Sequence, residues 1–144
     1  MAANTAPIFS LSGDVSSNST TAMAPTLTTA AADYTGISVN NKLVFTAGAN
    51  GGFVQRLRFK AIGTNSAASV ARIYLNNGST NTTATNNSFY GELALPTTTA
   101  IATTPTIDLD YTMNFALPAG FTIYVGLGTT ATAGWVVTAI AGEY

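Results

Sequence analysis

The sequence predicts an all-β sandwich, and three observations support this fold class. Short runs of the chain alternate apolar and polar residues, which is the pattern of half-buried strands. Turn-forming Gly, Asn and Pro residues separate these runs, and no segment repeats apolar residues at the 3.6-residue period of a helix. About seven or eight closely spaced strands in 144 residues fit one domain, and we expect them to be arranged as a jelly roll.

The expected strands are the apolar runs between turn signals. They occupy residues 37–45, 53–62, 70–75, 89–95, 107–115, 121–127 and 135–141. The first two are joined by the sequence AGANGG, in which Asn50 and Gly51 readily adopt the positive φ of a tight turn. The polar sequence NNGSTNTTATNN at 76–87 predicts a loop, and Pro96 leads into a Thr-rich connector.

Two of these strands have faces of clearly different chemistry, because alternate residues of a strand share a face. In 53–62, one face carries Phe53, Gln55, Leu57, Phe59 and Ala61, and the other carries Val54, Arg56, Arg58, Lys60 and Ile62. In 107–115, one face carries Ile107, Leu109, Tyr111, Met113 and Phe115, and the other carries Asp108, Asp110, Thr112 and Asn114. We expect most of the strand aromatics in the core, namely Phe45, Phe53, Phe59, Phe89, Tyr111, Phe115, Phe121 and Trp135.

The first 35 residues differ from the rest of the chain. They are rich in Ser, Thr, Ala and Asn, contain Pro7 and Pro25, and show no lasting periodicity. We therefore expect an extended N-terminal arm over 1–35, with at most one short strand near 8–11, ahead of a sandwich domain over 36–144. Ordering one backbone residue costs about 1–2 kcal/mol. An ordered arm therefore needs contacts that offset this cost, either with the protein's own body or with a neighbouring copy.

The composition argues against an enzyme. The chain has no His and no Cys, and charged residues make up only 8 % of it. The usual general base, thiol nucleophile and soft metal ligands are therefore missing, and the many Ser and Thr residues have no base to activate them. Asp108 and Asp110 share a strand face, but no motif supports a glycosidase pair or a calcium loop around them. We expect no catalytic residue, no metal and no cofactor.

The overall charge also narrows the range of partners. A net charge of −1 and a pI near 4.9 create no field that attracts nucleic acid or anionic lipid. No apolar run approaches the roughly 18–20 residues that a bilayer requires. A net charge near zero favours self-association. We expect neither a nucleic acid nor a membrane as partner, and we expect a homo-oligomer.

The cations are concentrated in one part of the chain. All five lie between positions 42 and 72, and Arg56, Arg58 and Lys60 project from one strand face. This stripe is a docking surface for an acidic partner, an ion-pair network between subunits, or a solvated outer face that discourages edge pairing. Asp108 and Asp110 are expected to face solvent and to meet Arg56 or Arg58 across an interface. The candidate interface residues are Lys42, Arg56, Arg58, Lys60, Arg72, Asp108 and Asp110, together with Ile8 and Phe9 of the arm.

Tyrosines offer a further alternative. Tyr74, Tyr90 and Tyr124 could form a platform on which a sugar stacks, as in β-sandwich lectins, and the polar loop 76–87 could serve the same purpose. A carbohydrate-binding module is therefore a second class of function that the sequence leaves open.

Four passages carry a resemblance to a known class of protein. They are MAANTAPIF, LVFTAGANGGFVQRLRFKAIGTN, IYLNNGSTNTTATNNSFYGELAL and LPAGFTIYVGLGTTATAGWVVTAIAGEY, and they cover most of residues 40–144 and the first ten. They resemble small virion structural proteins of tailed bacteriophages and prophages. No functional residue is carried over, since such proteins act through whole surfaces.

This resemblance implies a β-sandwich that decorates the capsid as a cement protein, commonly as a homotrimer. Its N-terminal arm would reach neighbours and clamp adjacent major capsid proteins. The protein would be made in the bacterial cytoplasm and act on the capsid surface of the virion. Tail-tube, fibre and host-attachment proteins share this low-charge style and are the alternatives within the virion.

Overall fold

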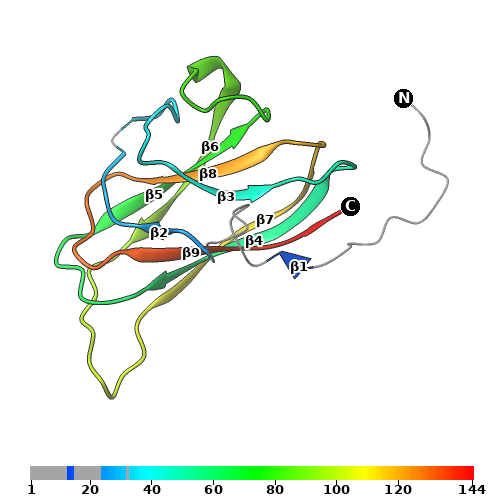
Figure 1. Cartoon of the computed structure of the whole chain (residues 1–144). Helices are drawn as coiled ribbons and strands as arrows, with labels where there is room; N and C mark the ends of the chain where they lie inside the picture. Colours follow the sequence, from blue (N-terminus) through cyan, green and yellow to red (C-terminus); the bar gives the residue numbers. More distant parts are fainter. Residues whose placement is uncertain (1–12, 15–23, 32) are drawn as a thin grey trace.

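Two antiparallel β-sheets pack face to face in the computed structural model, which describes residues 13–14, 24–31 and 33–144 (Figure 1). Ile8, Phe9 and the strand expected near 8–11 lie outside the described residues. The strands are β1 (Gly13–Asp14), β2 (Thr26–Leu27), β3 (Lys42–Thr46), β4 (Gly52–Ala61), β5 (Ser69–Asn76), β6 (Asn87–Leu95), β7 (Asp108–Leu117), β8 (Thr122–Leu127) and β9 (Trp135–Glu143). A three-residue 3₁₀ turn, Ala84–Asn86, lies between β5 and β6.

The strands are connected as a jelly roll. The five-stranded sheet has the order β1-β9-β4-β7, with β2 also paired to β9, and the four-stranded sheet has the order β3-β8-β5-β6. The antiparallel pairs nest like one long hairpin, in which β5 pairs with β6, β4 with β7, β3 with β8 and β2 with β9. Rolling up this hairpin brings β4 beside β9 and β5 beside β8. The predicted all-β sandwich with jelly-roll strand order is confirmed.

The core lies between the two sheets and follows from strand alternation. In β9, Trp135, Val137 and Ala139 are buried, whereas the residues between them are half-buried on the opposite face. In β7 the predicted apolar face points inward, with Met113 buried and its apolar neighbours packed against the core. The largest fully buried side chains of the core come from both sheets and are Trp135, Phe45, Phe59, Leu27, Leu57, Ile73, Leu95, Ile123, Leu127, Val44 and Val54. Tyr74 is also fully buried but lies outside this core cluster.

A β-bulge in β4 changes one predicted face. Gln55 is an extra residue between Val54 and Arg56 relative to β9, so alternation shifts by one position there. Val54 consequently points into the core, and Phe53, expected in the core, is 37 % exposed. Downstream of the bulge the predicted faces hold. The other aromatic that leaves the core is Phe89, which is 41 % exposed on the edge strand β6.

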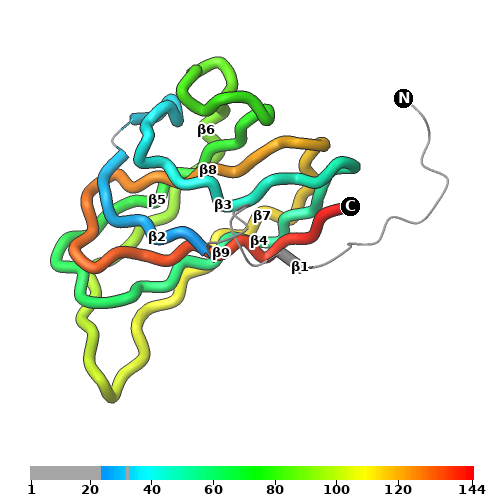
Figure 2. The backbone as a smooth tube through the Cα atoms, viewed as in Figure 1, coloured from blue at the N-terminus to red at the C-terminus, as the bar shows by residue number. Residues whose placement is uncertain are grey.

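Residues 24–31 and 33–36, which we call the strap, connect the two sheets. Leu27 lies in β2, which pairs with β9 of the five-stranded sheet, and Leu27 is buried. Farther along, the Ala31 N–H donates a hydrogen bond of 2.6 Å to the Leu127 carbonyl in the four-stranded sheet, and Ala31 is also buried. The protein's own body therefore holds this end of the segment that we expected to be an arm. β1 pairs with the other end of β9, near the C-terminus (Figure 2).

Candidate functional site

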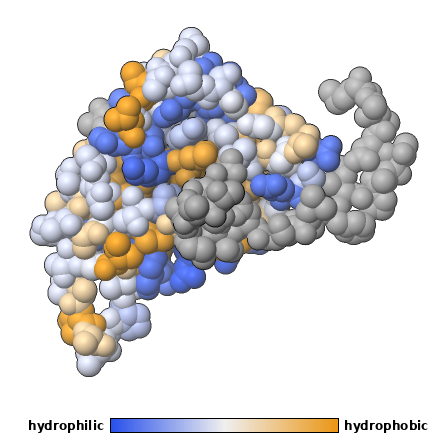
Figure 3. All heavy atoms as spheres, viewed as in Figure 1, coloured by the Kyte–Doolittle hydropathy of each residue, from blue (hydrophilic) through white to orange (hydrophobic). Residues whose placement is uncertain are grey.

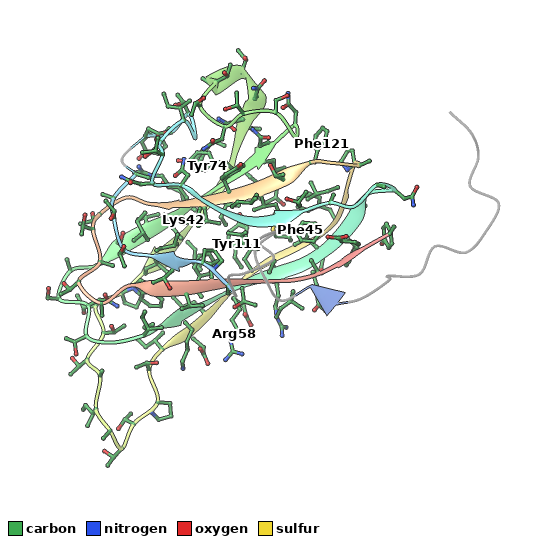
Figure 4. The ribbon with its side chains drawn as sticks, in the orientation of Figure 1. Lys42, Phe45, Arg58, Tyr74, Tyr111 and Phe121 are labelled. Carbon is green, nitrogen blue, oxygen red and sulfur yellow. The ribbon has the colours of Figure 1, made fainter. Side chains whose placement is uncertain are left out.

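The outer face of the five-stranded sheet brings together most of the predicted interface residues. The registers of β9, β4 and β7 place residues in three rows that run across the three strands. These rows are Val136–Lys60–Asp108, Thr138–Arg58–Asp110 and Ile140–Arg56–Thr112. We call this surface the outer face. Figure 4 shows Arg58 projecting from it, on the side of the sheet away from the core residue Phe45.

The charged side chains of the outer face form ion pairs within one chain. Arg58 Nη2 lies 2.8 Å from Asp108 Oδ2, Lys60 Nζ lies 3.2 Å from Asp108 Oδ1, and Arg56 Nε lies 3.7 Å from Asp110 Oδ1. The hydrogen bond from Arg58, assisted by Lys60, holds the pKa of Asp108 below its usual value. The sequence predicted that these groups meet across an interface between molecules. They meet instead across adjacent strands, because β4 and β7 are neighbours in the sheet.

A shallow groove of ≈ 440 Å³ lies on the β9 side of the ion pairs. It is lined by Arg58, Lys60, Ile62, Val136, Thr138 and Ile140. The charged groups of Arg58 and Lys60 bind Asp108 on β7. These two residues therefore line the groove with the aliphatic parts of their side chains. Figure 3 shows hydrophobic and hydrophilic residues side by side on the surface near β2 and β9.

The apolar residues of this groove were not among the predicted interface residues. Ile62 is 51 % exposed, and Val136 and Ile140 are half-buried on the outward side of β9. The sequence did contain a signal for them. The run WVVTAIA in β9 is apolar at nearly every position rather than at alternate ones, which is typical of a strand covered on both faces.

Lys42 and Arg72 do not belong to the outer face. Lys42 is exposed on β3 in the other sheet, and no ion pair of Lys42 is seen in the described part of the chain. Arg72 lies on β5, where its Nε donates to Glu92 Oε1 at 3.1 Å and its guanidinium carbon lies 4.0 Å from the centre of the Tyr34 ring. Burial by itself lowers the pKa of Arg72. The hydrogen bond to Glu92 and the electrostatic effects of Tyr34, Tyr74 and Glu92 outweigh burial, so the pKa is raised.

The three tyrosines proposed as a sugar platform do not form one. Tyr74 is fully buried beneath the strap, and its hydroxyl donates a hydrogen bond of 2.7 Å to the Asp33 carbonyl. Burial and the charge of Asp33 raise the pKa of Tyr74 to about 12. Tyr124 is half-buried beside it on β8, whereas Tyr90 lies on β6 with its ring 6.2 Å from that of Tyr111 on β7. Burial also raises the pKa of Tyr111.

A second groove, of ≈ 330 Å³, lies beside the predicted polar loop. Its apolar part comes from Leu75, Phe115, Ala116, Leu117, Pro118 and Phe121, and its polar part comes from Asn76, Asn77, Thr85, Asn86, Asn87 and Ser88. No charged side chain is among these residues. The amides of Asn76, Asn86 and Asn87 are already hydrogen-bonded within the loop, so they shape the groove rather than face it with free donors.

Over residues 13–14, 24–31 and 33–144, no three His, Cys, Asp or Glu side chains come together as metal ligands. In the same part of the chain, no helix is long and apolar enough to cross a membrane. Comparison with protein families, curated proteins and solved structures finds no match.

Proposed function

We propose that this protein is a non-enzymatic structural component of a phage virion. In this proposal it decorates the capsid as a cement protein and clamps neighbouring major capsid proteins through its N-terminal segment and its sandwich surface. The single observation that carries the proposal is the outer face, where an apolar groove runs beside a row of ion-paired Arg and Lys side chains. Apolar contact area bordered by polar groups, with Arg enriched, is characteristic of protein–protein interfaces.

The state of the carboxylates supports a structural rather than a catalytic role. A general acid at neutral pH needs a raised pKa. Asp108 is held by Arg58 and Lys60, which lower its pKa, and Asp110 lies beside Arg56. The pair that could have served a glycosidase is therefore engaged in ion pairs at the surface.

The experiment that tests the proposal is fractionation of the phage that carries this chain. Purified particles are separated into capsids and tails, and the chain is quantified in each fraction by mass spectrometry. We expect it in the capsid fraction at a fixed ratio to the major capsid protein. Its recovery with tails would replace decoration by the tail-tube, fibre or host-attachment alternative, and its absence from particles would overturn a virion role altogether.

A carbohydrate-binding module is the second candidate, and the groove beside loop 76–87 favours it. Aromatic rings and an uncharged lining suit a neutral sugar better than a charged ligand. A glycan array probed with the full chain tests this function. Binding that Phe121→Ala removes, while Phe53→Ala on the other sheet leaves it unchanged, would support it; an array without hits would dismiss it.

A further inference from the structure

We propose that the groove on the outer face receives residues 7–11 from a second copy of this chain. The inference deepens the proposed function and rests on it, because it names the partner that the outer face binds. It joins subunits to one another through the groove, and the capsid contact proposed above then falls to the ion-paired side of the outer face and to the rest of the sandwich surface.

The groove is apolar because the ion pairs draw charge away from it. Arg58 and Lys60 both bind Asp108, and Lys60 Nζ also donates a hydrogen bond of 2.7 Å to the Thr106 carbonyl. Both acceptors belong to β7 or the residues just before it, on the side of β4 opposite the groove. The groove is then lined by two aliphatic stems and by the uncharged side chains of Ile62, Val136, Thr138 and Ile140. Such a surface favours an uncharged, apolar occupant.

The N-terminal segment has the chemistry of that occupant. The first charged side chain in the chain is Asp14, and Pro7, Ile8, Phe9 and Leu11 form an apolar cluster ahead of it. In an extended chain, Pro7, Phe9 and Leu11 share one face at a spacing of roughly 6–7 Å. Val136, Thr138 and Ile140 repeat along the groove at the same two-residue spacing. The apolar face of an extended segment therefore matches the spacing of a groove whose row has an apolar residue at each end and the uncharged Thr138 between them.

The direction of β1 assigns the occupant to a second copy. Gly13 pairs with Gly142 and Asp14 with Ala141, so β1 runs antiparallel to β9. The N-terminal end of β1, Gly13, therefore lies at the Gly142 end of β9. The groove lies toward the opposite end of β9, at Val136 to Ile140. Because β1 lies at the end of β9 away from the groove, we assign the occupant to a second copy rather than to the same chain.

This exchange has a consequence for assembly. Each copy gives one segment and receives one. Two copies that exchange segments reciprocally form a two-fold dimer, whereas segments passed head to tail make a heterologous contact. Heterologous contacts close into a ring when the rotation between copies allows it. After the dimer, the smallest ring with one cyclic axis is a trimer. This agrees with the trimer expected from the resemblance.

Cysteine cross-linking tests the inference, because the full chain contains no native Cys. Ser10→Cys in the segment and Thr138→Cys in the groove are made as separate variants, mixed, and treated with a short bismaleimide reagent. A cross-linked dimer that forms in this mixture and in neither variant treated alone joins positions 10 and 138 of different copies, and it is the expected result. Ile62→Cys, at an exposed position of the same groove, replaces Thr138→Cys should that variant not fold. Asn77→Cys, in the exposed loop near the other groove, is the matched control and should give no dimer.

Two more variants test whether the contact needs an apolar side chain from residues 7–11. Phe9→Ser should remove the cross-link, whereas Thr5→Ser, outside residues 7–11, should leave it. A cross-link that forms only within a double variant, Ser10→Cys with Thr138→Cys, would overturn the second-copy assignment. One that Ser17→Cys forms with Thr138→Cys in place of Ser10→Cys would overturn residues 7–11 as the occupant. No cross-link in any mixture would overturn the inference too. The isolated chain suffices for this test, so its failure leaves the capsid fractionation result standing and is distinguishable from it.

Discussion

Asn65 shows how a single buried side chain holds the loops at one end of the sandwich. It is fully buried, and its Oδ1 accepts hydrogen bonds of 2.9 Å from the N–H groups of both Ala133 and Gly134. Its Nδ2 donates to Thr98 Oγ1 at 3.1 Å. One amide thereby joins the loops after β4, after β6 and after β8, which are far apart in the sequence.

Replacing Asn65 should therefore destabilise the protein strongly. Asn65→Ala leaves two buried N–H groups without an acceptor, and we expect a loss of about 3 kcal/mol in the free energy of unfolding. Asn50→Ala, at an exposed turn position, is the matched control and should change it by less than about 0.5 kcal/mol. Urea unfolding followed by tryptophan fluorescence measures both. A loss below about 1 kcal/mol for Asn65→Ala would contradict this role.

Tyr74 gives the folded protein a pH dependence in alkali. Its pKa is about 12 in the folded state and about 10 in an unfolded chain, so between these values the unfolded state gives up the proton more readily. The free energy of unfolding should therefore be unaffected by this group below pH 10. It should then fall by about 1.4 kcal/mol per pH unit as the pH rises toward 12. Urea unfolding of the native chain and of Tyr74→Phe at several pH values measures this contribution, and equal slopes for both would contradict it.

At the scale of elements, β7 departs from regular strand geometry at one residue. Asn114 has φ of 52°, the one positive φ of a residue other than Gly in the described ranges. It lies where three steps along β7, from Thr112 to Phe115, face two steps along β4. The left-handed conformation disfavours a Cβ atom, and Asn tolerates it better than most residues.

Ala is usually more stabilising than Gly inside a strand, and this order of stability should be reversed at position 114. We expect Asn114→Gly to be more stable than Asn114→Ala by about 1 kcal/mol, because Gly has no Cβ to strain. At Thr112, exposed on the same strand without a positive φ, Ala should be the more stable of the two replacements. Thermal unfolding of the four variants compares them. The same order at both positions would contradict a strained bulge.

The elements also show what the sequence could and could not predict. Six of the seven main strands were predicted to within two residues at each end, because alternation and turn residues are local signals. The strand expected at 37–45 begins only at Lys42, because a turn precedes it in which the Asn41 N–H donates a hydrogen bond to the Ser38 carbonyl. The bulge at Gln55 is not visible in that pattern, so Phe53 was assigned to the wrong face. Burial of Tyr74 depends on the strap, and the pairing of Asp108 with Arg58 depends on which strands are neighbours. Both are consequences of tertiary structure that no local pattern carries.

At the scale of the whole molecule, charge and apolar surface are separated on the outer face. Ion pairs between exposed groups contribute about 0–1 kcal/mol each, so the paired charges add little to folding. Their effect lies in keeping charge off the apolar groove beside them.

If the groove joins copies through residues 7–11, native mass spectrometry of the full chain should show a closed trimer, and Phe9→Ser should shift it toward monomer. Long polymers would indicate a tail-tube role instead, and a monomer under all conditions would contradict the exchange.

The most direct test of the central claim is binding of the full chain to capsids. Shells assembled from the major capsid protein of the same phage are mixed with increasing amounts of the chain and sedimented. We predict saturable binding at a fixed ratio of chain to capsid subunit, which a chain lacking residues 1–12 should fail to reach. A full chain that stays in the supernatant at every concentration would contradict the proposal that it is a capsid decoration protein.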